Sequence, residues 1–286
     1  MRSSPLLLLL PAFLAMAAVA AYPLYYGIRA SFEQYRYGRK VGSAGLDNYT
    51  RVLHDDVFWQ AVGTTAKFVG LAVSIETVLG VGLALVVNRE IRLTKIVRMS
   101  LLLPMTIAPV AVGVIWRLLY ASDIGFVNPL FTMFGLAAPN VLATERGAFL
   151  GVVAVDVWEW TPLIFLIAFA GLQSLPQEPL EAARVDGAGR LRMFFDHTLP
   201  LLMPVLMAAI VLRMIDAIGT FDTIFVLTRG GPGNATQLTS IYAYNTAFQF
   251  TQEGLAMAMV VMTGVVVLLL FVTVIRLTRR ASRWVV

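Results

Sequence analysis

The sequence contains no cysteine, which excludes a disulfide framework, a thiolate nucleophile and a cysteine-ligated zinc site. Its two histidines, His54 and His197, stand far apart along the chain, so we expect no metal site built on histidine. Charged residues are also scarce, at 14% of 286 residues, against about 25% in an average soluble domain. With 58% apolar residues, the chain carries more apolar surface than a globule of this length can bury, so part of it must face lipid.

The small excess of basic residues is also consistent with a membrane protein. The net charge of +5 comes from 22 lysines and arginines against 17 acidic residues. In a soluble protein such a balance can indicate nucleic-acid binding. Here we expect no nucleic-acid partner, because basic loops are what hold the cytoplasmic side of a membrane protein. The lipid bilayer is therefore the first partner that the composition predicts.

Six apolar stretches are long enough to cross the hydrocarbon layer as helices, which takes about 20 residues each. They lie near residues 5–27, 61–87, 99–121, 148–172, 199–228 and 255–276. The fifth is longer than a minimal span, so we expect it to tilt or to project beyond the hydrocarbon. The sequence thus predicts an all-α integral membrane protein with six transmembrane helices, which form a single domain over residues 1–286.

The topology follows from the number of spans and from the basic residues. An even number of spans places both termini on one side, and the basic residues of the loops favour a cytoplasmic location for both. The preference is moderate, because the first outer loop is itself basic. The stretch Ala17–Ala21 could also be the cleavage site of a signal peptide. The apolar run that continues through residues 22–26 favours a retained helix instead.

The loop at residues 175–198 carries the strongest local pattern. Two early prolines followed by Glu181 predict a short helix, because proline is tolerated in a first helical turn. Gly187 and a second glycine two residues later predict its end, and a second short helix is expected from Arg190. Phe194 and the phenylalanine after it form an apolar pair on this loop. Such a pair indicates either a docking site for another protein or side chains that rest against the membrane interface.

This loop resembles the signature loop of the membrane subunits of ABC importers. The matching residues are Glu181-Ala182-Ala183, Asp186-Gly187-Ala188, Phe194 and Leu199-Pro200. Residues 221–228, which run into the glycine-rich stretch 230–236, are similar to the end of the fifth helix in the carbohydrate-uptake branch, the maltose and glycerol-phosphate type. His197 departs from the pattern, since an apolar residue is frequent there, and this leaves its packing open.

The resemblance implies a type I ABC importer permease fold. It also implies that the loop is a coupling helix seated in a cleft of an ATPase subunit. Glu181 and Gly187 match the best-known positions, and the expected coupling residues are Glu181, Ala182, Ala183, Asp186, Gly187, Ala188 and Phe194. The implied partners are a second homologous permease, two ATP-binding subunits that form a homodimer, an extracytoplasmic solute-binding protein and a sugar. The implied location is the inner cell membrane of a bacterium or an archaeon.

The source of energy must lie in a partner. ATP binding would need a glycine-rich loop that ends in Gly-Lys-Ser or Gly-Lys-Thr. The chain has three lysines, Lys40, Lys67 and Lys95, and none of them directly follows a glycine. We therefore expect that this chain is not an enzyme and binds no cofactor, and that the partner ATPase uses ATP and Mg²⁺. The spans would then rock between inward and outward openings when that partner moves the loop.

Eight charged residues lie within the predicted spans, where each must be paired, hydrated or near an end. They are Lys67, Glu76, Arg117, Asp156, Glu159, Arg213, Asp216 and Asp222. Asp156, Glu159 and Trp160 share one helical face, as do Arg213 and Asp216. Carboxylates accept hydrogen bonds from sugar hydroxyls and an aromatic ring covers a pyranose face, so both groups are candidates for the substrate path. The alternative is a cluster of ion pairs between helices that joins Asp216 or Glu159 to Arg213 or Arg117. No metal site is expected.

Two other classes of function remain for comparison. An ion-coupled secondary transporter would use Asp156, Glu159 and Asp216 to relay protons. A membrane enzyme is disfavoured, because the loops provide no set of nucleophile, base and orienting group. Within the importer hypothesis, a disaccharide, a glycoside and a polyol phosphate all suit the family. The surplus of carboxylates in the spans only mildly disfavours an anionic solute.

Overall fold

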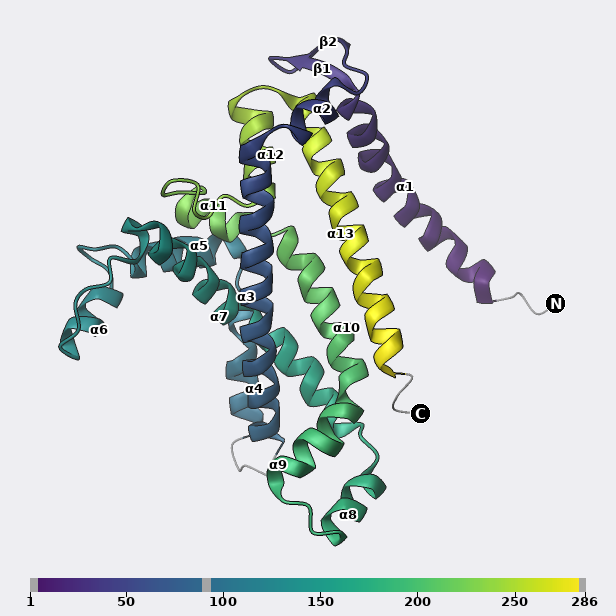
Figure 1. Ribbon diagram of the computed structural model, residues 1–286, viewed down its shortest axis with the longest axis vertical. Coiled ribbons are helices and arrows are strands. Elements are labelled where there is room, and N and C mark those ends of the chain that lie inside the picture. Colours follow the sequence, from purple (N-terminus) through teal and green to yellow (C-terminus); the bar gives the residue numbers. More distant parts are fainter. Residues whose placement is uncertain (1–4, 89–93, 283–286) are drawn as a thin grey trace. The chain divides into compact units, whose positions relative to one another are not determined.

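The computed structural model describes residues 5–88 and 94–282, and it is helical apart from one short hairpin (Figure 1). The chain divides into two compact units. The first combines Met1–Val62 with Thr239–Val266, and the second combines Gly63–Leu238 with Val267–Val286. Two long helices, α3 (Asp56–Val87) and α13 (Glu253–Ser282), have residues in both units.

The first unit begins with helix α1 (Pro5–Ser31) and a hairpin of strands β1 (Glu33–Arg36) and β2 (Arg39–Ser43). Tyr37 and Gly38 both have positive φ, which a two-residue hairpin loop requires. Helix α2 (Asp47–Leu53) follows, and the later part of the chain adds α12 (Thr239–Tyr244) and the π-helical turn η4 (Asn245–Gln249). The hairpin therefore lies next in sequence to the end of α1.

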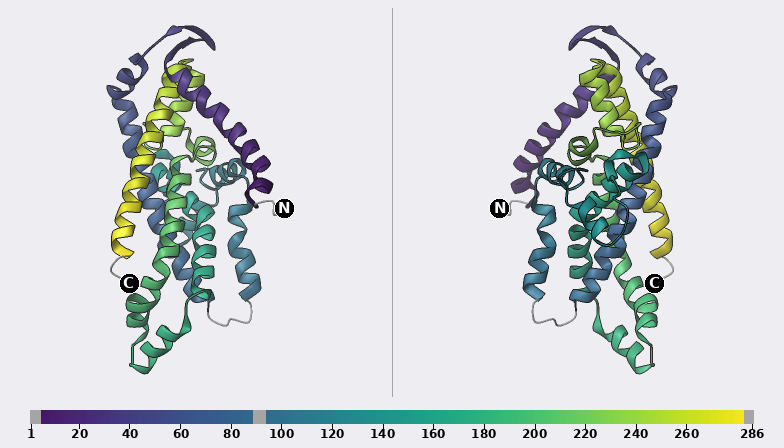
Figure 2. Two further views of the ribbon diagram at one scale, coloured as in Figure 1. Left: turned by 90° about the vertical axis from the view of Figure 1, so that its right-hand side faces the viewer. Right: turned by 90° about the vertical axis from the view of Figure 1, so that its left-hand side faces the viewer.

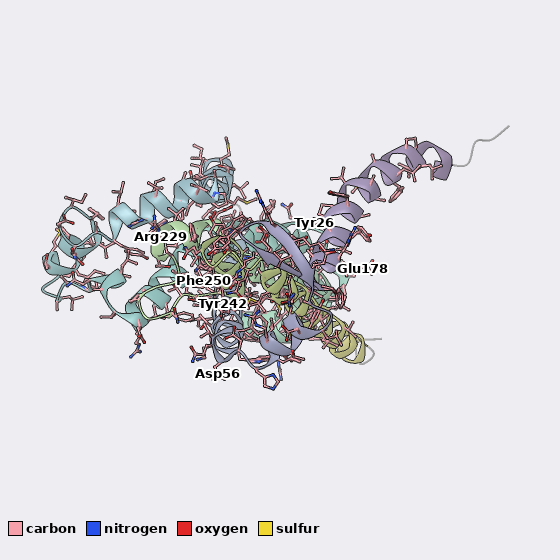
Figure 3. All side chains as sticks on the ribbon, turned by 90° about the horizontal axis from the view of Figure 1, so that it is seen from above. Tyr26, Asp56, Glu178, Arg229, Tyr242 and Phe250 are labelled. Carbon is pink, nitrogen blue, oxygen red and sulfur yellow. The ribbon has the colours of Figure 1, made fainter. Side chains whose placement is uncertain are left out.

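Side-chain hydrogen bonds and a small core hold this unit together. Asp55 caps α3, since its Oδ1 accepts from the backbone N–H of residue 57 at 2.9 Å, while its Oδ2 accepts from Tyr242 Oη at 2.7 Å. Tyr242 and other side chains of the unit are drawn in Figure 3. Asn48 is buried and donates to the carbonyls of Ser31 and Glu33. The buried apolar residues are Val52, Phe58, Ala243, Leu255, Ala258 and Met259. These contacts join the hairpin, α2 and the N-terminal parts of α3 and α13 into one body.

The second unit contains the remaining helices. Between α3 and the next long helix, the elements are α4 (Thr94–Leu102), the 3₁₀ turn η1 (Pro104–Thr106), α5 (Pro109–Leu119), α6 (Val127–Met133) and the 3₁₀ turn η2 (Val141–Ala143). The elements that follow are α7 (Glu145–Gln173), α8 (Gln177–Val185), α9 (Arg190–Arg192), the π-helical turn η3 (Met193–Thr198), α10 (Leu199–Ile218) and α11 (Asp222–Thr228). Both views of Figure 2 show α8 and α9 together at one end of α7 and α10.

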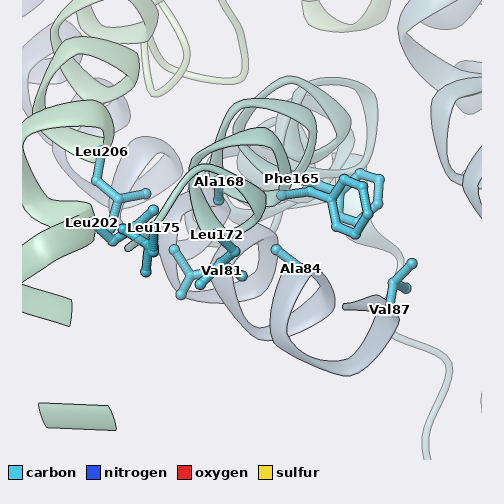
Figure 4. Packing of buried hydrophobic residues seen from close by; sticks show 10 residues of the cluster. Val81, Ala84, Val87, Phe165, Ala168, Leu172, Leu175, Leu202 and Leu206 are labelled. Carbon is cyan, nitrogen blue, oxygen red and sulfur yellow. The ribbon is translucent and has the colours of Figure 1, made fainter. Parts of the chain in front are cut away.

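The core of the second unit lies where α3, α7 and α10 meet. Figure 4 shows its aliphatic and aromatic side chains packed between these helices. The buried members are Val81, Ala84, Val87, Phe165, Ala168, Phe169, Leu172, Leu175, Leu202 and Leu206. Gly80 permits close approach of α3 to α7, because a Cβ there would lie 2.8 Å from Ile164 Cγ2. This core fixes the three helices that carry most of the charged residues described below.

Four helical segments of the described chain are long and apolar enough to span a membrane: Leu9–Ser31, Asp56–Val87, Glu145–Gln173 and Arg190–Ile218. They correspond to the predicted first, second, fourth and fifth spans. Two shorter apolar helices, Pro109–Leu119 and Glu253–Leu269, lie at the predicted third and sixth spans. The predicted helical membrane fold is therefore found, with one short hairpin added, while the number of six spans stays a prediction.

Two of the predicted spans are wrong as continuous helices. The stretch 99–121 is divided at Pro104 and Pro109, each of which begins a new helical segment. The stretch 199–228 ends as a helix at Ile218, and a separate helix begins at Asp222. The basic residues Arg2, Arg89, Arg92 and Arg283, which entered the prediction of topology, lie outside the described residues.

Candidate functional site

The loop at residues 175–198 forms the two short helices that the sequence predicts. Helix α8 ends at Val185, and Gly187 takes a φ of +77°. The N–H of Gly187 donates to the carbonyl of Arg184 at 3.1 Å, and that of Ala188 donates to Ala183 at 3.0 Å. This pair of bonds is a Schellman motif, which satisfies the last carbonyls of a helix and favours glycine at the left-handed position. The segment Asp186-Gly187-Ala188 is thus a structural stop that fixes how α8 is presented.

The expected coupling residues divide between an exposed and a buried face. Ala183 is buried. Glu181, Ala182, Asp186 and Gly187 are exposed, and Ala188 is partly exposed. Apolar side chains also face outward from this loop: Val185, Leu191 and Phe195 are 88%, 76% and 58% exposed. A surface of this kind at the end of a helical bundle is typical of a protein docking site.

Phe194 does not belong to that outer surface. It is partly buried and packs against the core between α3, α7 and α10, whereas Phe195 stays exposed with its ring 4.9 Å from that of Phe194. The two rings therefore do not form one exposed apolar pair, since only Phe195 faces outward. Consecutive residues of a helical turn point about 100° apart, so one ring can reach the core while its neighbour faces outward. Phe194 connects the short helices mechanically to the long ones.

The second candidate site is a buried cluster around Arg213 of α10, whose side chain is fully buried. Glu76 of α3 accepts from Arg213 Nε at 2.9 Å and from Nη2 at 3.1 Å, a bidentate pair. Nη2 also donates to Asp156 of α7, and Nη1 donates to Asp216 Oδ2 at 3.1 Å. The Trp160 ring lies 5.1 Å from the guanidinium carbon. Ion pairs thus connect α3, α7 and α10.

The members of this cluster differ in exposure. Glu76 and Arg213 are completely buried, and the Asp156 side chain is 4% exposed. The Asp216 side chain is 50% exposed and Trp160 is partly exposed. The cluster therefore has an interior of three residues and an outer edge formed by an acidic and an aromatic side chain.

Glu159 lies apart from these ion pairs. Its Oε2 accepts from Thr223 Oγ1 of α11 at 3.3 Å, and the same hydroxyl contacts the carbonyl of Pro109 at 3.1 Å. Helix α11 packs against α5 so closely that a Cβ on Gly113 would lie 2.9 Å from the carbonyl oxygen of Thr223. Arg117 of α5 donates to the carbonyl of Val226 at 3.3 Å. These contacts join α5, α7 and α11.

The structure brings most of the predicted intramembrane residues together. Asp156, Trp160, Arg213 and Asp216 meet in one cluster. The alternative hypothesis expected ion pairs between helices, but the pair between Arg213 and Asp216 lies within α10, and the pairs that do connect helices join Arg213 to Glu76 and Asp156. Glu159 is directed to α11 instead. Sequence reasoning left Glu76 out of the site, although a carboxylate in the middle of an apolar span already indicated a partner on another helix. Whether any of these residues contacts a solute stays a prediction.

Within the described residues, no group of acidic and histidine side chains has the arrangement of a metal site. The carboxylates around Arg213 are occupied by its guanidinium. The contacts of this cluster are therefore ionic and hydrogen-bonded.

Comparison with known proteins identifies the family. The model for the binding-protein-dependent transport system inner membrane component matches residues 76–285, which include the short helices and the residues around Arg213. The chain belongs to this family. Its members are the permease components of ABC transporters, and the assignment favours the importer hypothesis over the ion-coupled and enzymatic alternatives.

Relatives of this permease are named for the transport of sugars. The trehalose/maltose transport system permease protein of Thermococcus litoralis is 40% identical over 224 residues, which cover 78% of this chain and 76% of the relative. The sulfoquinovosyl glycerol transport system permease protein of Agrobacterium fabrum is 31% identical and covers 91% of this chain and 85% of its own.

A solved structure supports the fold of the permease. One chain of a bacterial alginate ABC transporter, crystallised in complex with a periplasmic protein bound to an alginate pentasaccharide, superimposes with a TM-score of 0.84. It covers 98% of this chain and 96% of its own, at 22% identity. The helical fold is therefore that of an ABC importer permease.

Proposed function

We propose that this chain is the membrane-spanning permease of an ATP-driven importer that carries a sugar, or a related glycoside or polyol, into the cytoplasm. It would work with a second homologous permease, two ATP-binding subunits and an extracytoplasmic solute-binding protein. Both termini and the α8 loop would face the cytoplasm. ATP and Mg²⁺ would bind to the partner ATPase and not to this chain.

The observation that carries the proposal is the construction of the α8 loop. The exposed Glu181 stands on a short helix whose end is set by Gly187, and Phe194 joins the loop to the core of the long helices. A short helix that is rigid at its end and anchored through a ring can transmit a push without bending. The residue types match the signature loop of importer permeases at each of these positions.

The trehalose/maltose name of one relative supports the class of solute. The proposed solute path contains the residues Asp156, Glu159, Trp160, Arg213 and Asp216. A carboxylate beside an indole ring suits a sugar, because the carboxylate accepts from hydroxyls while the ring covers an apolar sugar face. Trp160 and Asp216 form the outer edge of the cluster and are the members that a solute in the path would meet first.

The test compares two exposed glutamates of the same helix. Glu181 and Glu178 both stand on α8 and are both exposed, so replacing either by alanine leaves the core intact. Glu181→Ala should lower ATP-driven sugar uptake by the reconstituted complex by at least about tenfold, which corresponds to about 1.4 kcal/mol of lost coupling. Glu178→Ala should retain uptake. The complex should still assemble with its ATPase, as measured by co-purification.

Two results would contradict the proposal. One is equal uptake by the Glu181→Ala and wild-type complexes. The other is purification of the chain without any ATP-binding subunit from cells that express the complete set of partners. A chain that imports solute without an ATPase would not be a permease of this kind.

A further inference from the structure

The cluster around Arg213 assigns different roles to residues that look equivalent in the sequence. We propose that Glu76 and Asp156 hold Arg213 as an internal strut, that Asp216 with Trp160 forms the face toward the solute, and that this face therefore selects against anionic solutes. The proposal rests on the proposed transport function and specifies its solute class. Glu76 and Asp156 are positioning residues in this account, and Asp216 determines specificity.

Arg213 is not available to a solute in this arrangement. Four of the five N–H donors that a guanidinium offers are directed to Glu76, Asp156 and Asp216. Its side chain is completely buried and the indole of Trp160 lies 5.1 Å from its central carbon. An anionic group could reach this cation only by displacing a buried carboxylate, which would then be left without its partner at high energetic cost. The cation therefore serves the fold of the bundle.

Asp216 has the opposite environment. Its side chain is 50% exposed, although it lies near the end of a helix long and apolar enough to span a membrane. A carboxylate in such a helix does not face lipid but turns to a water-filled cavity or to the bundle interior. The partly exposed Trp160 is adjacent to the same guanidinium. An acceptor and a ring thus stand together at the exposed edge of the cluster.

The charge balance of the cluster follows from these contacts. Three carboxylates, those of Glu76, Asp156 and Asp216, surround one guanidinium, and only that of Asp216 lies at the exposed edge. The two buried carboxylates are held against Arg213, and the exposed edge is acidic. A neutral polyhydroxylated solute can donate hydrogen bonds to Asp216, whereas a carboxylate, sulfonate or phosphate is repelled.

Because the chain has no cysteine, each role can be tested with a single introduced thiol. In the assembled complex, Asp216→Cys should react with a cationic methanethiosulfonate at least about tenfold faster than with an anionic one, relative to the same ratio at the exposed control Asp47→Cys. Glu76→Cys should react with neither reagent until the protein is denatured. Asp156→Cys provides the same test if the first buried variant does not fold.

Selectivity is measured by uptake of labelled maltose in competition with its carboxylate derivative maltobionate. The binding protein is wild type throughout, so a change in the ratio reports on the permease. Asp216→Asn should reduce the preference for maltose by about tenfold, because the neutral amide no longer repels the carboxylate of maltobionate. Asp47→Asn is the matched control and should leave the preference unchanged.

The results separate this inference from the proposed function. Rapid labelling at position 76, no labelling at position 216, or an unchanged preference in Asp216→Asn would overturn the division of roles. Failure of the complex to import maltose and every other sugar tried would instead contradict the proposed function. The labelling pattern would then still decide the positions of Glu76 and Asp216, because it requires no transport.

Discussion

At residue 187 the backbone has a φ of +77°, which glycine adopts freely and other L-residues adopt at a cost of about 1–2 kcal/mol. A Cβ at Gly187 would meet no atom within 4 Å, so the effect of a substitution there is purely conformational. Gly187→Ala should therefore loosen the end of α8 without a steric clash. Amide exchange of residues 183–188 should rise by about tenfold.

Gly189 provides the matched control for this prediction. A Cβ at this position would also meet no atom within 4 Å, but the φ of −67° is accessible to alanine. Gly189→Ala should leave exchange in α8 unchanged, and Gly187→Asn should fall between the two because asparagine tolerates the left-handed region. Equal exchange in Gly187→Ala and Gly189→Ala would show that the Schellman motif does not hold this helix end.

Residue patterns predicted some of these roles and not others. Proline and glycine report on local backbone preference, so the limits of α8 could be read from Pro176 and Gly187 without the fold. Glu76 could not be placed in the site, because its partner Arg213 is 137 residues away and no local rule connects them. The packing of Phe194 could not be predicted for the same reason, since only the fold decides which of two adjacent rings meets the core.

At the scale of elements, α3 and α7 meet through a glycine. A Cβ on Gly80 would lie 2.8 Å from Ile164 Cγ2 and 2.9 Å from the backbone nitrogen of Phe165, whereas one on Gly82 of the same helix would meet nothing. Gly80→Ala should lower the free energy of unfolding by about 1–3 kcal/mol through overpacking. Gly82→Ala should be neutral or slightly stabilising. Thermal unfolding in one detergent compares the two, and equal midpoints would contradict the close contact.

The hairpin of β1 and β2 predicts a dependence on pH. Glu33 accepts from Lys40 Nζ at 2.5 Å, and this hydrogen bond lowers the pKa of the Glu33 carboxyl below its ordinary value. A lowered pKa in the folded state contributes stability that is fully present above the unfolded pKa, about 4.3, and is lost as the pH falls through the lower pKa of the folded state. Amide exchange of residues 33–43, corrected for intrinsic rates, should therefore rise as the pH drops from 6 to 3.

Glu33→Gln is the control for this prediction, because glutamine does not titrate. Its hairpin should exchange at a rate that changes little over the same range. A wild-type hairpin with the same flat profile would show that the contact with Lys40 does not stabilise the strands.

Element boundaries within the apolar stretches were the least predictable part of the fold. The predicted third span, 99–121, contains Pro104 and Pro109, and prolines are tolerated in transmembrane helices because neighbouring helices can satisfy the carbonyls that a proline frees. Instead they divide the stretch, and α5 packs closely against α11. Hydropathy records only that these residues are apolar. It does not distinguish a continuous span from a stretch that is divided into short helices, one of which packs against another part of the chain.

At the scale of the whole molecule, the chain combines a short exposed helix, a packed bundle and a buried ionic cluster. Phe194 links the first to the second, and Arg213 joins three helices of the bundle within the third. A movement imposed on α8 would therefore reach the helices that carry Asp216 and Trp160. This continuity within one unit is the structural basis of the proposed coupling between an external ATPase and a solute path.

The most direct test of the proposed function is to measure solute uptake by purified protein in liposomes, with and without the ATP-binding subunits. The account predicts uptake only by the complete complex, only with ATP on the side of α8, and without sensitivity to ionophores. Accumulation of solute by this chain alone, driven by an ion gradient and abolished by an ionophore, would contradict it.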